Sequence, residues 1–182
     1  MISIPNFISI GRLLAAPLIV WLILDDHLGA AFWVFVAAGL SDAADGFLAR
    51  RLNAASRVGE VLDPIADKML LICIYVTLGI QELLWSWLVI LVVSRDVLII
   101  GAHLLASALG QKIAHTPLLI GKVNTAAQIA LAALVLGAAG LAISTDNIVP
   151  WVAYLVGVTT IASGVVYLRR WIKSVPNIGE LE

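Results

Sequence analysis

The stretch SDAADGFLARRLNAASRVGEVLDPIADKML, residues 41–70, carries five acidic residues, four of them aspartates, inside a chain that is otherwise apolar. Of the 182 residues, 62% are hydrophobic and 13% are charged, and the mean hydropathy is +1.04. Charged residues are about half as frequent as in an ordinary soluble domain. A soluble helical bundle would need more charge on its outward faces, so this composition favours a helical membrane protein.

Long apolar runs recur on both sides of the aspartate-rich stretch. At about 20 residues per span, these runs predict an all-α integral membrane protein with six transmembrane helices. The length is that of a single membrane domain over residues 1–182. The predicted spans cover residues 4–24, 29–50, 60–80, 86–108, 121–143 and 148–172.

The lysines and arginines fall on one side of this arrangement. The expected loops near residues 25–28, 81–85 and 144–149 contain none, and all eleven basic residues lie at or toward the opposite ends of the spans. Because positive residues stay on the cytoplasmic side, we expect a bacterial inner-membrane protein, or a mitochondrial inner-membrane protein whose basic side faces the matrix. No basic patch of the kind that binds nucleic acid is present, so no nucleic-acid partner is expected.

The four aspartates lie where the second and third predicted spans approach their shared turn. At about 100° per residue, Asp42 and Asp45 share one face of the second span, and Asp63 and Asp67 share one face of the third. A short turn joins the two spans, so they are expected to be antiparallel neighbours whose acidic faces meet. The predicted active site therefore lies at the cytoplasmic ends of the second and third spans.

Four carboxylates at membrane depth need a compensating charge, since each costs about 2.5–3.5 kcal/mol on insertion and like charges repel. Arg50 and Lys68 could neutralise two of them, which leaves a purely structural ion-pair network as the weaker interpretation. Divalent cations would neutralise the set, and oxygen ligands suit Mg²⁺, Mn²⁺ or Ca²⁺ rather than Zn²⁺. The small residues Gly46 and Ala49 leave room for a ligand on the same face, beside the Arg50 guanidinium. This predicts a diphosphate next to the metal.

Intramembrane acids also mark ion carriers and proton pathways. A path of that kind would spread its acids across the bilayer, whereas these four all lie at the depth of one leaflet. Transport, or a non-catalytic scaffold, is therefore the weaker alternative.

The stretch also matches the signature D-x2-D-G-x2-A-R-x8-G-x3-D-x3-D at all eight fixed positions, and on these residues the chain resembles the CDP-alcohol phosphatidyltransferase family. The eight positions are Asp42, Asp45, Gly46, Ala49, Arg50, Gly59, Asp63 and Asp67. The resemblance implies that a CDP-linked lipid, CDP-diacylglycerol, gives its phosphatidyl group to an alcohol and that CMP leaves. It also implies two divalent cations, Mg²⁺ or Mn²⁺, and a homodimer surrounded by membrane lipids.

Residue roles follow from the same resemblance. It implies four metal ligands, Asp42, Asp45, Asp63 and Asp67, and it makes Asp67 the catalytic general base as well. The implied CDP-binding residues are Asp42, Gly46, Ala49, Arg50 and Gly59. Phospholipase-D-type chemistry through a covalent intermediate would need paired His-x-Lys motifs, which the three histidines do not form. Direct in-line displacement is therefore expected.

Three further segments bear on the acceptor. LDPIADK (residues 62–68) is similar to phosphatidylglycerophosphate synthases and CMP-forming cardiolipin synthases alike, whereas VVSRDVLIIGA (92–102) and LIGKVNTAAQIALAA (119–133) are similar to eukaryotic-type cardiolipin synthases. The glycerophosphate enzymes usually carry Arg-Glu in place of Arg95–Asp96, with a further arginine in that helix. The resemblance therefore favours phosphatidylglycerol as acceptor and cardiolipin as product. The alternative acceptor is glycerol 3-phosphate, the substrate of a phosphatidylglycerophosphate synthase.

Both acceptors are anionic alcohols that contain a phosphate. Three cations outside the motif lie near the cytoplasmic ends of predicted spans and are candidates to bind this phosphate: Arg12, Arg95 and Lys122. For Arg12 and Lys122 the alternative is a side chain that snorkels to the headgroup level. For Arg95 the alternative is an ion pair with Asp96.

Overall fold

The computed structural model describes the backbone of residues 4–52, 57–108, 119–145 and 147–174. Side chains are described over the same ranges apart from residues 4–10, 12–13, 42–52, 57–67, 103, 105–108 and 170–174. The described backbone forms six helices, which correspond one to one with the predicted spans. They are α1 (Ile4–Leu24), α2 (Leu28–Leu52), α3 (Arg57–Ile80), α4 (Ser86–Ala108), α5 (Leu119–Gly140) and α6 (Val149–Ser174).

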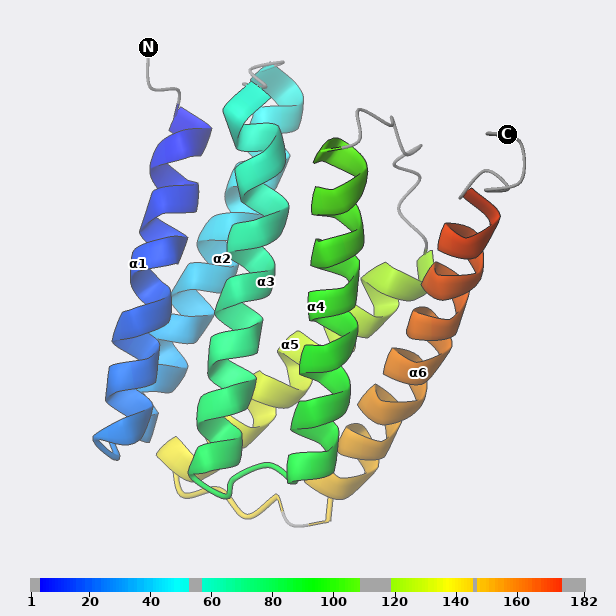
Figure 1. Ribbon diagram of the computed structural model, residues 1–182. Helices are drawn as coiled ribbons and strands as arrows, with labels where there is room; N and C mark the ends of the chain where they lie inside the picture. Colours follow the sequence, from blue (N-terminus) through cyan, green and yellow to red (C-terminus); the bar gives the residue numbers. More distant parts are fainter. Residues whose placement is uncertain (1–3, 53–56, 109–118, 146, 175–182) are drawn as a thin grey trace, which may run out of the picture.

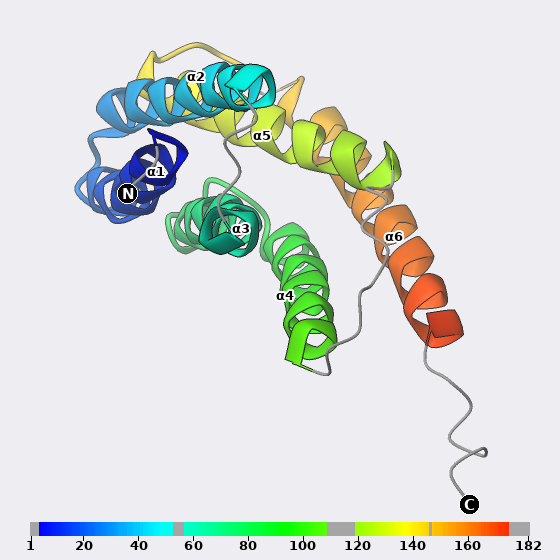
Figure 2. The same ribbon diagram turned by 90° about the horizontal axis from the view of Figure 1, so that it is seen from above.

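Successive helices run in opposite directions, so that α1 begins and α6 ends at the same end of the molecule (Figure 1). We call this end, where α2 also ends and α3 begins, the motif end. Helix–helix contacts follow a ring in the order α1, α2, α5, α6, α4, α3 and back to α1, and α5 also reaches across to α3. Figure 2 shows this order from above. The ring brings together helices that lie far apart in the sequence.

The interior of the ring is filled by large apolar side chains. Ile19, Ile74, Tyr75, Leu88 and Leu131 are all fully buried, and they come from α1, α3, α4 and α5. The outer surface is apolar as well, with Leu98 70% and Trp151 77% exposed. Such extensive exposed apolar surface is consistent with a membrane protein.

The helices differ in how clearly they qualify as membrane spans. By length and composition, α5 and the Val149–Arg169 part of α6 are long and apolar enough to cross a membrane. Shorter apolar segments occupy Leu14–Leu24, Leu28–Ser41 and Lys68–Ile80 of α1, α2 and α3. The part of the chain that the structure describes is thus all-helical, as predicted, while the count of six membrane spans stays a prediction.

The end opposite the motif end is closed by three turns of one kind. Asp26, Glu82 and Ala142 follow α1, α3 and α5 and adopt left-handed backbone conformations, with φ of 57°, 57° and 53°. After each of them the next backbone N–H donates to the carbonyl five residues earlier, as from Ile143 to Ala138 at 3.0 Å. This turn ends α5 at Gly140, three residues before the predicted end of the span at residue 143.

Helices α2 and α5 approach each other most closely at the same end. A Cβ atom on Gly140 would lie 2.5 Å from the backbone nitrogen of Gly29, and one on Gly29 would lie 3.1 Å from the Gly140 carbonyl oxygen. Only two glycines allow the two backbones to touch in this way.

Candidate active site

The aspartate motif lies at the ends of two helices. The last turns of α2 contain Asp42, Asp45, Gly46, Ala49 and Arg50, and the first turns of α3 contain Gly59, Asp63 and Asp67. Both segments belong to the motif end, and the two helices run in opposite directions as expected (Figure 1). The prediction that they are direct neighbours is wrong for the described residues, because α2 contacts α1 and α5 whereas α3 contacts α1, α4 and α5. The side chains of the motif lie outside the described residues. Their meeting, and their roles as metal ligands, CDP contacts and base, therefore stay predictions.

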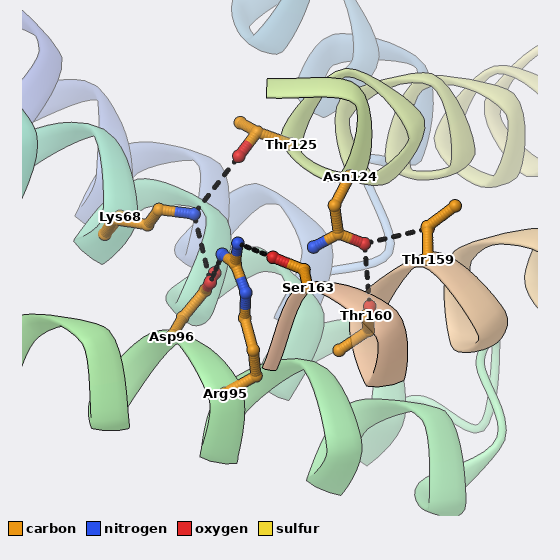
Figure 3. Close-up of polar contacts among 8 residues, drawn as sticks. All are labelled: Lys68, Arg95, Asp96, Asn124, Thr125, Thr159, Thr160 and Ser163. Carbon is orange, nitrogen blue, oxygen red and sulfur yellow. Dashed lines mark hydrogen bonds and ion pairs between the residues drawn. The ribbon is translucent and has the colours of Figure 1, made fainter. Parts of the chain in front are cut away.

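Immediately after the motif, a buried ion-pair cluster joins α3 to α4. The Lys68 ammonium and the Arg95 guanidinium both donate to one oxygen of Asp96, Oδ1, over 3.0 Å from Nζ and 2.5 Å from Nη1 (Figure 3). Arg95 is 5% exposed and Asp96 is fully buried. Lys68 could have paired with an aspartate of the motif, but its described partners are Asp96 and, at 3.2 Å, the Thr125 hydroxyl.

The Arg95 guanidinium is held from α6 as well. Its Nη2 donates to the Ser163 hydroxyl over 2.5 Å, and its central carbon lies 5.5 Å from the centre of the Tyr167 ring. The ion pair between Arg95 and Asp96, which was the alternative to a phosphate contact, thus forms, and part of the guanidinium takes no part in it. Nε is buried and has no hydrogen-bond partner within the described part of the chain.

Polar side chains of α5 and α6 extend this cluster. Asn124 Oδ1 accepts hydrogen bonds from the hydroxyls of Thr159 and Thr160, each over 2.9 Å (Figure 3). Gln128 lies one turn further along α5, and its backbone carbonyl accepts a hydrogen bond from the Tyr75 hydroxyl over 3.0 Å. The side-chain amide nitrogens of Asn124 and Gln128 are buried without a partner among the residues described here.

We name the group formed by Lys68, Arg95, Asp96, Asn124 and Ser163 the polar cluster. Its described side chains comprise two cations and one carboxylate, hence one surplus positive charge among them. A surplus charge in a low-dielectric interior is costly unless an anion compensates it. Buried donors of Arg95 and Asn124 also lack partners among the described residues, and such groups usually do find partners. The arrangement therefore suits an anion that accepts hydrogen bonds.

The other two candidate phosphate ligands, Lys122 and Arg12, are not part of the polar cluster as the structure describes it. Lys122 is exposed, and its neighbour Gly121 is buried against the Tyr167 side chain. The side chain of Arg12 lies outside the described residues. Both assignments stay predictions.

Sequence reasoning did not assign Lys68, Asn124, Thr160 or Ser163 to a site. A usable signal was present, since Asn124, Gln128, Thr160 and Ser163 interrupt apolar runs at intervals of three or four residues. Polar residues placed on one helix face inside a membrane span usually face other helices.

Comparisons with known proteins agree with the motif. The sequence profile of the CDP-alcohol phosphatidyltransferase family matches residues 2–162. The chain therefore belongs to the CDP-alcohol phosphatidyltransferase family. That family defines the class of this protein, as the motif alone had implied.

Three similar proteins carry two kinds of name. The chain is 38% identical over 184 residues to the chloroplastic CDP-diacylglycerol–glycerol-3-phosphate 3-phosphatidyltransferase 1 of Oryza sativa, covering 91% of this chain and 56% of the rice protein. It is 38% identical over 152 residues to the CMP-forming cardiolipin synthase of Rattus norvegicus, covering 75% and 50% of the two chains. A Schizosaccharomyces pombe fusion of cardiolipin synthase with a mitochondrial hydrolase is 36% identical over 191 residues, with 91% and 30% covered. The chain thus spans about half the length of these relatives, or less.

Proposed function

We propose that this protein is an integral-membrane enzyme of phospholipid biosynthesis that transfers the phosphatidyl group of CDP-diacylglycerol to an anionic alcohol and releases CMP. One observation carries the proposal. The complete eight-position motif occupies the end of α2 and the start of α3 in a chain of this family, directly before Lys68 of the polar cluster.

The donor set of the motif fits divalent metal ions. Four aspartates, Asp42, Asp45, Asp63 and Asp67, offer only oxygen ligands, which Mg²⁺ and Mn²⁺ prefer. Elsewhere in the part of the chain that the structure describes, no group of three His, Cys, Asp or Glu residues could hold a metal. Two bound cations would supply electrostatic stabilisation of the charge that develops on the phosphoryl oxygens and on the leaving CMP.

The residues of the chain would then bind, orient and move a proton. Arg50 would bind the diphosphate of the CDP-lipid, with Asp42, Gly46, Ala49 and Gly59 lining the same subsite. Asp67 would accept the proton of the acceptor hydroxyl. The hydroxyl oxygen forms a bond to the phosphorus that carries the diacylglycerol, the bond from that phosphorus to the CMP oxygen breaks, and CMP leaves with the electron pair.

Phosphatidylglycerol is the acceptor that we propose, with cardiolipin as product. The Arg95–Asp96 pair supports it, because Asp96 offsets one of the two cations of the polar cluster and leaves a single surplus positive charge among its described side chains. The phosphodiester of phosphatidylglycerol carries one negative charge, which matches that surplus. Arg95 would contact this phosphate, and Lys122 and Arg12 would approach it from the cytoplasmic ends of their helices. Similarity to CMP-forming cardiolipin synthases also favours this acceptor.

Glycerol 3-phosphate is the second candidate, and the rice relative favours it by its name. The deciding experiment supplies purified protein with CDP-diacylglycerol and either phosphatidylglycerol or glycerol 3-phosphate, and identifies the lipid product by mass spectrometry. We expect cardiolipin from the first mixture and no phosphatidylglycerophosphate from the second. The reverse pattern would replace the proposed acceptor and keep the proposed metal site.

The membrane arrangement is part of the same proposal. Six spans would place the motif end in the cytoplasm or the mitochondrial matrix, because the basic residues gather there. A homodimer is expected from the family resemblance. Cysteine accessibility at the motif end tests the orientation, and cross-linking in nanodiscs tests the dimer.

A further inference from the structure

Asp96 uses one carboxylate oxygen and leaves the other unused. Oδ1 accepts from both Lys68 and Arg95, whereas Oδ2 has no hydrogen-bond partner among the described residues although the side chain is fully buried. A buried carboxylate normally uses the lone pairs of both oxygens. The free oxygen therefore calls for a hydrogen-bond donor.

The missing donor is expected to be neutral. A third cation beside Lys68 and Arg95 would raise the surplus charge of the polar cluster, which already exceeds its single carboxylate. A hydroxyl group supplies a donor without adding charge. Arg95 Nε, on the neighbouring residue of α4, is a buried donor that lacks an acceptor in the described structure. Together the two atoms suit a ligand with an anionic oxygen and a hydroxyl a few bonds apart.

We infer that Asp96 is a specificity-determining residue whose Oδ2 accepts a hydrogen bond from the secondary hydroxyl of a glycerol headgroup, while Arg95 binds its phosphate. This inference rests on the proposed function. Asp96 thereby has a role in acceptor selection that is separate from its ion pairs.

The order of the functional groups along a glycerol headgroup agrees with the order in which the proposed binding residues lie in the protein. In a glycerol headgroup the secondary hydroxyl lies between the carbon that bears the phosphate and the terminal hydroxyl that reacts. In the protein, Asp96 lies between Arg95 of its own helix and Lys68 of α3, and Lys68 directly follows the proposed base, Asp67. A headgroup with its phosphate at Arg95 and its secondary hydroxyl at Asp96 extends toward α3.

A purely structural role for Asp96 predicts a different pattern. If Asp96 only clamps α3 to α4, its loss lowers turnover of every acceptor by the same factor. If Asp96 binds the secondary hydroxyl, its loss affects acceptors that have this hydroxyl more than acceptors that lack it. The ratio of two acceptors therefore separates the two roles even where overall activity falls.

The experiment compares phosphatidylglycerol with its analogue phosphatidyl-1,3-propanediol, which lacks only the secondary hydroxyl. Glycerol 3-phosphate and 3-hydroxypropyl phosphate form the same pair for a soluble acceptor. The ratio of kcat/KM with and without the secondary hydroxyl is measured with whichever acceptor the enzyme uses, so the test does not depend on which acceptor is correct. A site built to bind a hydroxyl discriminates strongly against an analogue without it, and we expect wild-type kcat/KM to differ by at least ~10-fold.

Two variants complete the test. In Asp96→Ala the ratio is expected to fall to within about twofold of 1, because the hydroxyl then has no acceptor. Ser163→Ala is the matched control, since it removes another contact of Arg95 but leaves Asp96 Oδ2 in place, and it should keep the wild-type ratio.

The inference is overturned by a wild-type ratio near 1, which needs no variant and stays decisive if Asp96→Ala does not fold. It is also overturned by equal ratios in wild type and Asp96→Ala, which would leave Asp96 as a clamp between two helices or as the site of an ordered water.

Discussion

The two ends of the helix ring differ in the kind of residues and contacts that they contain. The motif end holds the aspartates and, just inside it, a buried group of charges and amides with several hydrogen-bonding atoms unpartnered in the described structure. The opposite end holds three tight turns and a glycine–glycine contact whose backbone groups are satisfied or closely packed. The difference shows how the fold divides its tasks. Near one end lie buried polar groups without described partners, and at the other end the helices are joined by close backbone contacts.

Removal of divalent metal ions should have the largest effect on the motif end. With CDP-diacylglycerol and acceptor present, excess EDTA should abolish CMP release, because four uncompensated carboxylates would repel the diphosphate. Release of CMP is measured by chromatography, and added Mg²⁺ or Mn²⁺ should restore it. Undiminished CMP release in EDTA would eliminate the metal mechanism.

Asp67→Asn should have the next largest effect. The amide keeps the size of the side chain but cannot accept the hydroxyl proton, so turnover should fall by at least ~10²-fold. Binding of the CDP-lipid, followed by thermal shift, should fall much less. A near wild-type rate would show that another group is the base.

The opposite end is probed at Gly140. A Cβ atom there would lie 2.5–2.7 Å from the backbone of Gly29 and Leu28, which cannot move aside as a side chain could. Gly140→Ala should lower the free energy of unfolding by about 1–3 kcal/mol, the usual cost of overpacking. The loss should appear as a lower midpoint in thermal denaturation in mild detergent.

Gly101→Ala is the matched control, because a Cβ atom on Gly101 of α4 meets nothing within 4 Å. Its midpoint should stay equal to that of the wild type or rise. If the two ends act independently, Gly140→Ala protein that is still folded should keep its KM for both substrates. A changed KM would mean that packing at the Gly140 end affects substrate binding at the motif end.

Arg95→Lys tests the polar cluster with a smaller change. Lysine keeps the charge but loses the planar fork that reaches Asp96 and Ser163 together. We expect KM for the anionic acceptor to rise by roughly 10-fold, the scale of one charge-assisted hydrogen bond. KM for CDP-diacylglycerol should be unchanged in the same assay, and a parallel rise in both constants would argue against an acceptor role.

The smallest effect is expected at Ala142. Its φ of 53° is unfavourable for a residue with a Cβ atom, so Ala142→Gly should stabilise the turn after α5 by about 0.5–1 kcal/mol. Ala139→Gly, in the exposed last turn of α5, should instead destabilise by a similar amount. Thermal midpoints of the pair should move in opposite directions; a shift of both in one direction would exclude left-handed strain as the cause.

Local sequence signals predicted the helices well. Apolar runs placed all six, because burial in lipid or core requires continuous apolar sequence over a helix length. The end of α5 was placed three residues late, since Leu141 and Ile143 continue the apolar run beyond the turn at Ala142. Hydropathy does not register a backbone that turns left-handed.

The polar cluster was predicted only in part. The Arg95–Asp96 pair was named only as the alternative to a phosphate contact of Arg95, whereas the Lys68–Asp96 pair joins residues 28 apart and depends on how α3 packs on α4. Likewise the Asn124 bonds to Thr159 and Thr160 depend on the α5–α6 contact. Sequence periodicity gives the face of a helix but not the helix that it meets.

The ring has a consequence for biogenesis. Helix α2 packs against α5, which leaves the ribosome some seventy residues later, and α4 packs against α6. A nascent chain that ends before α5 would hold α1 in contact with α2 and with α3, but the part of α2 that contains Gly29 would still lack its contact with Gly140 of α5. Closure of the ring is therefore a late event of folding, and the Lys68–Asp96–Arg95–Ser163 connection is completed only when the final helix arrives.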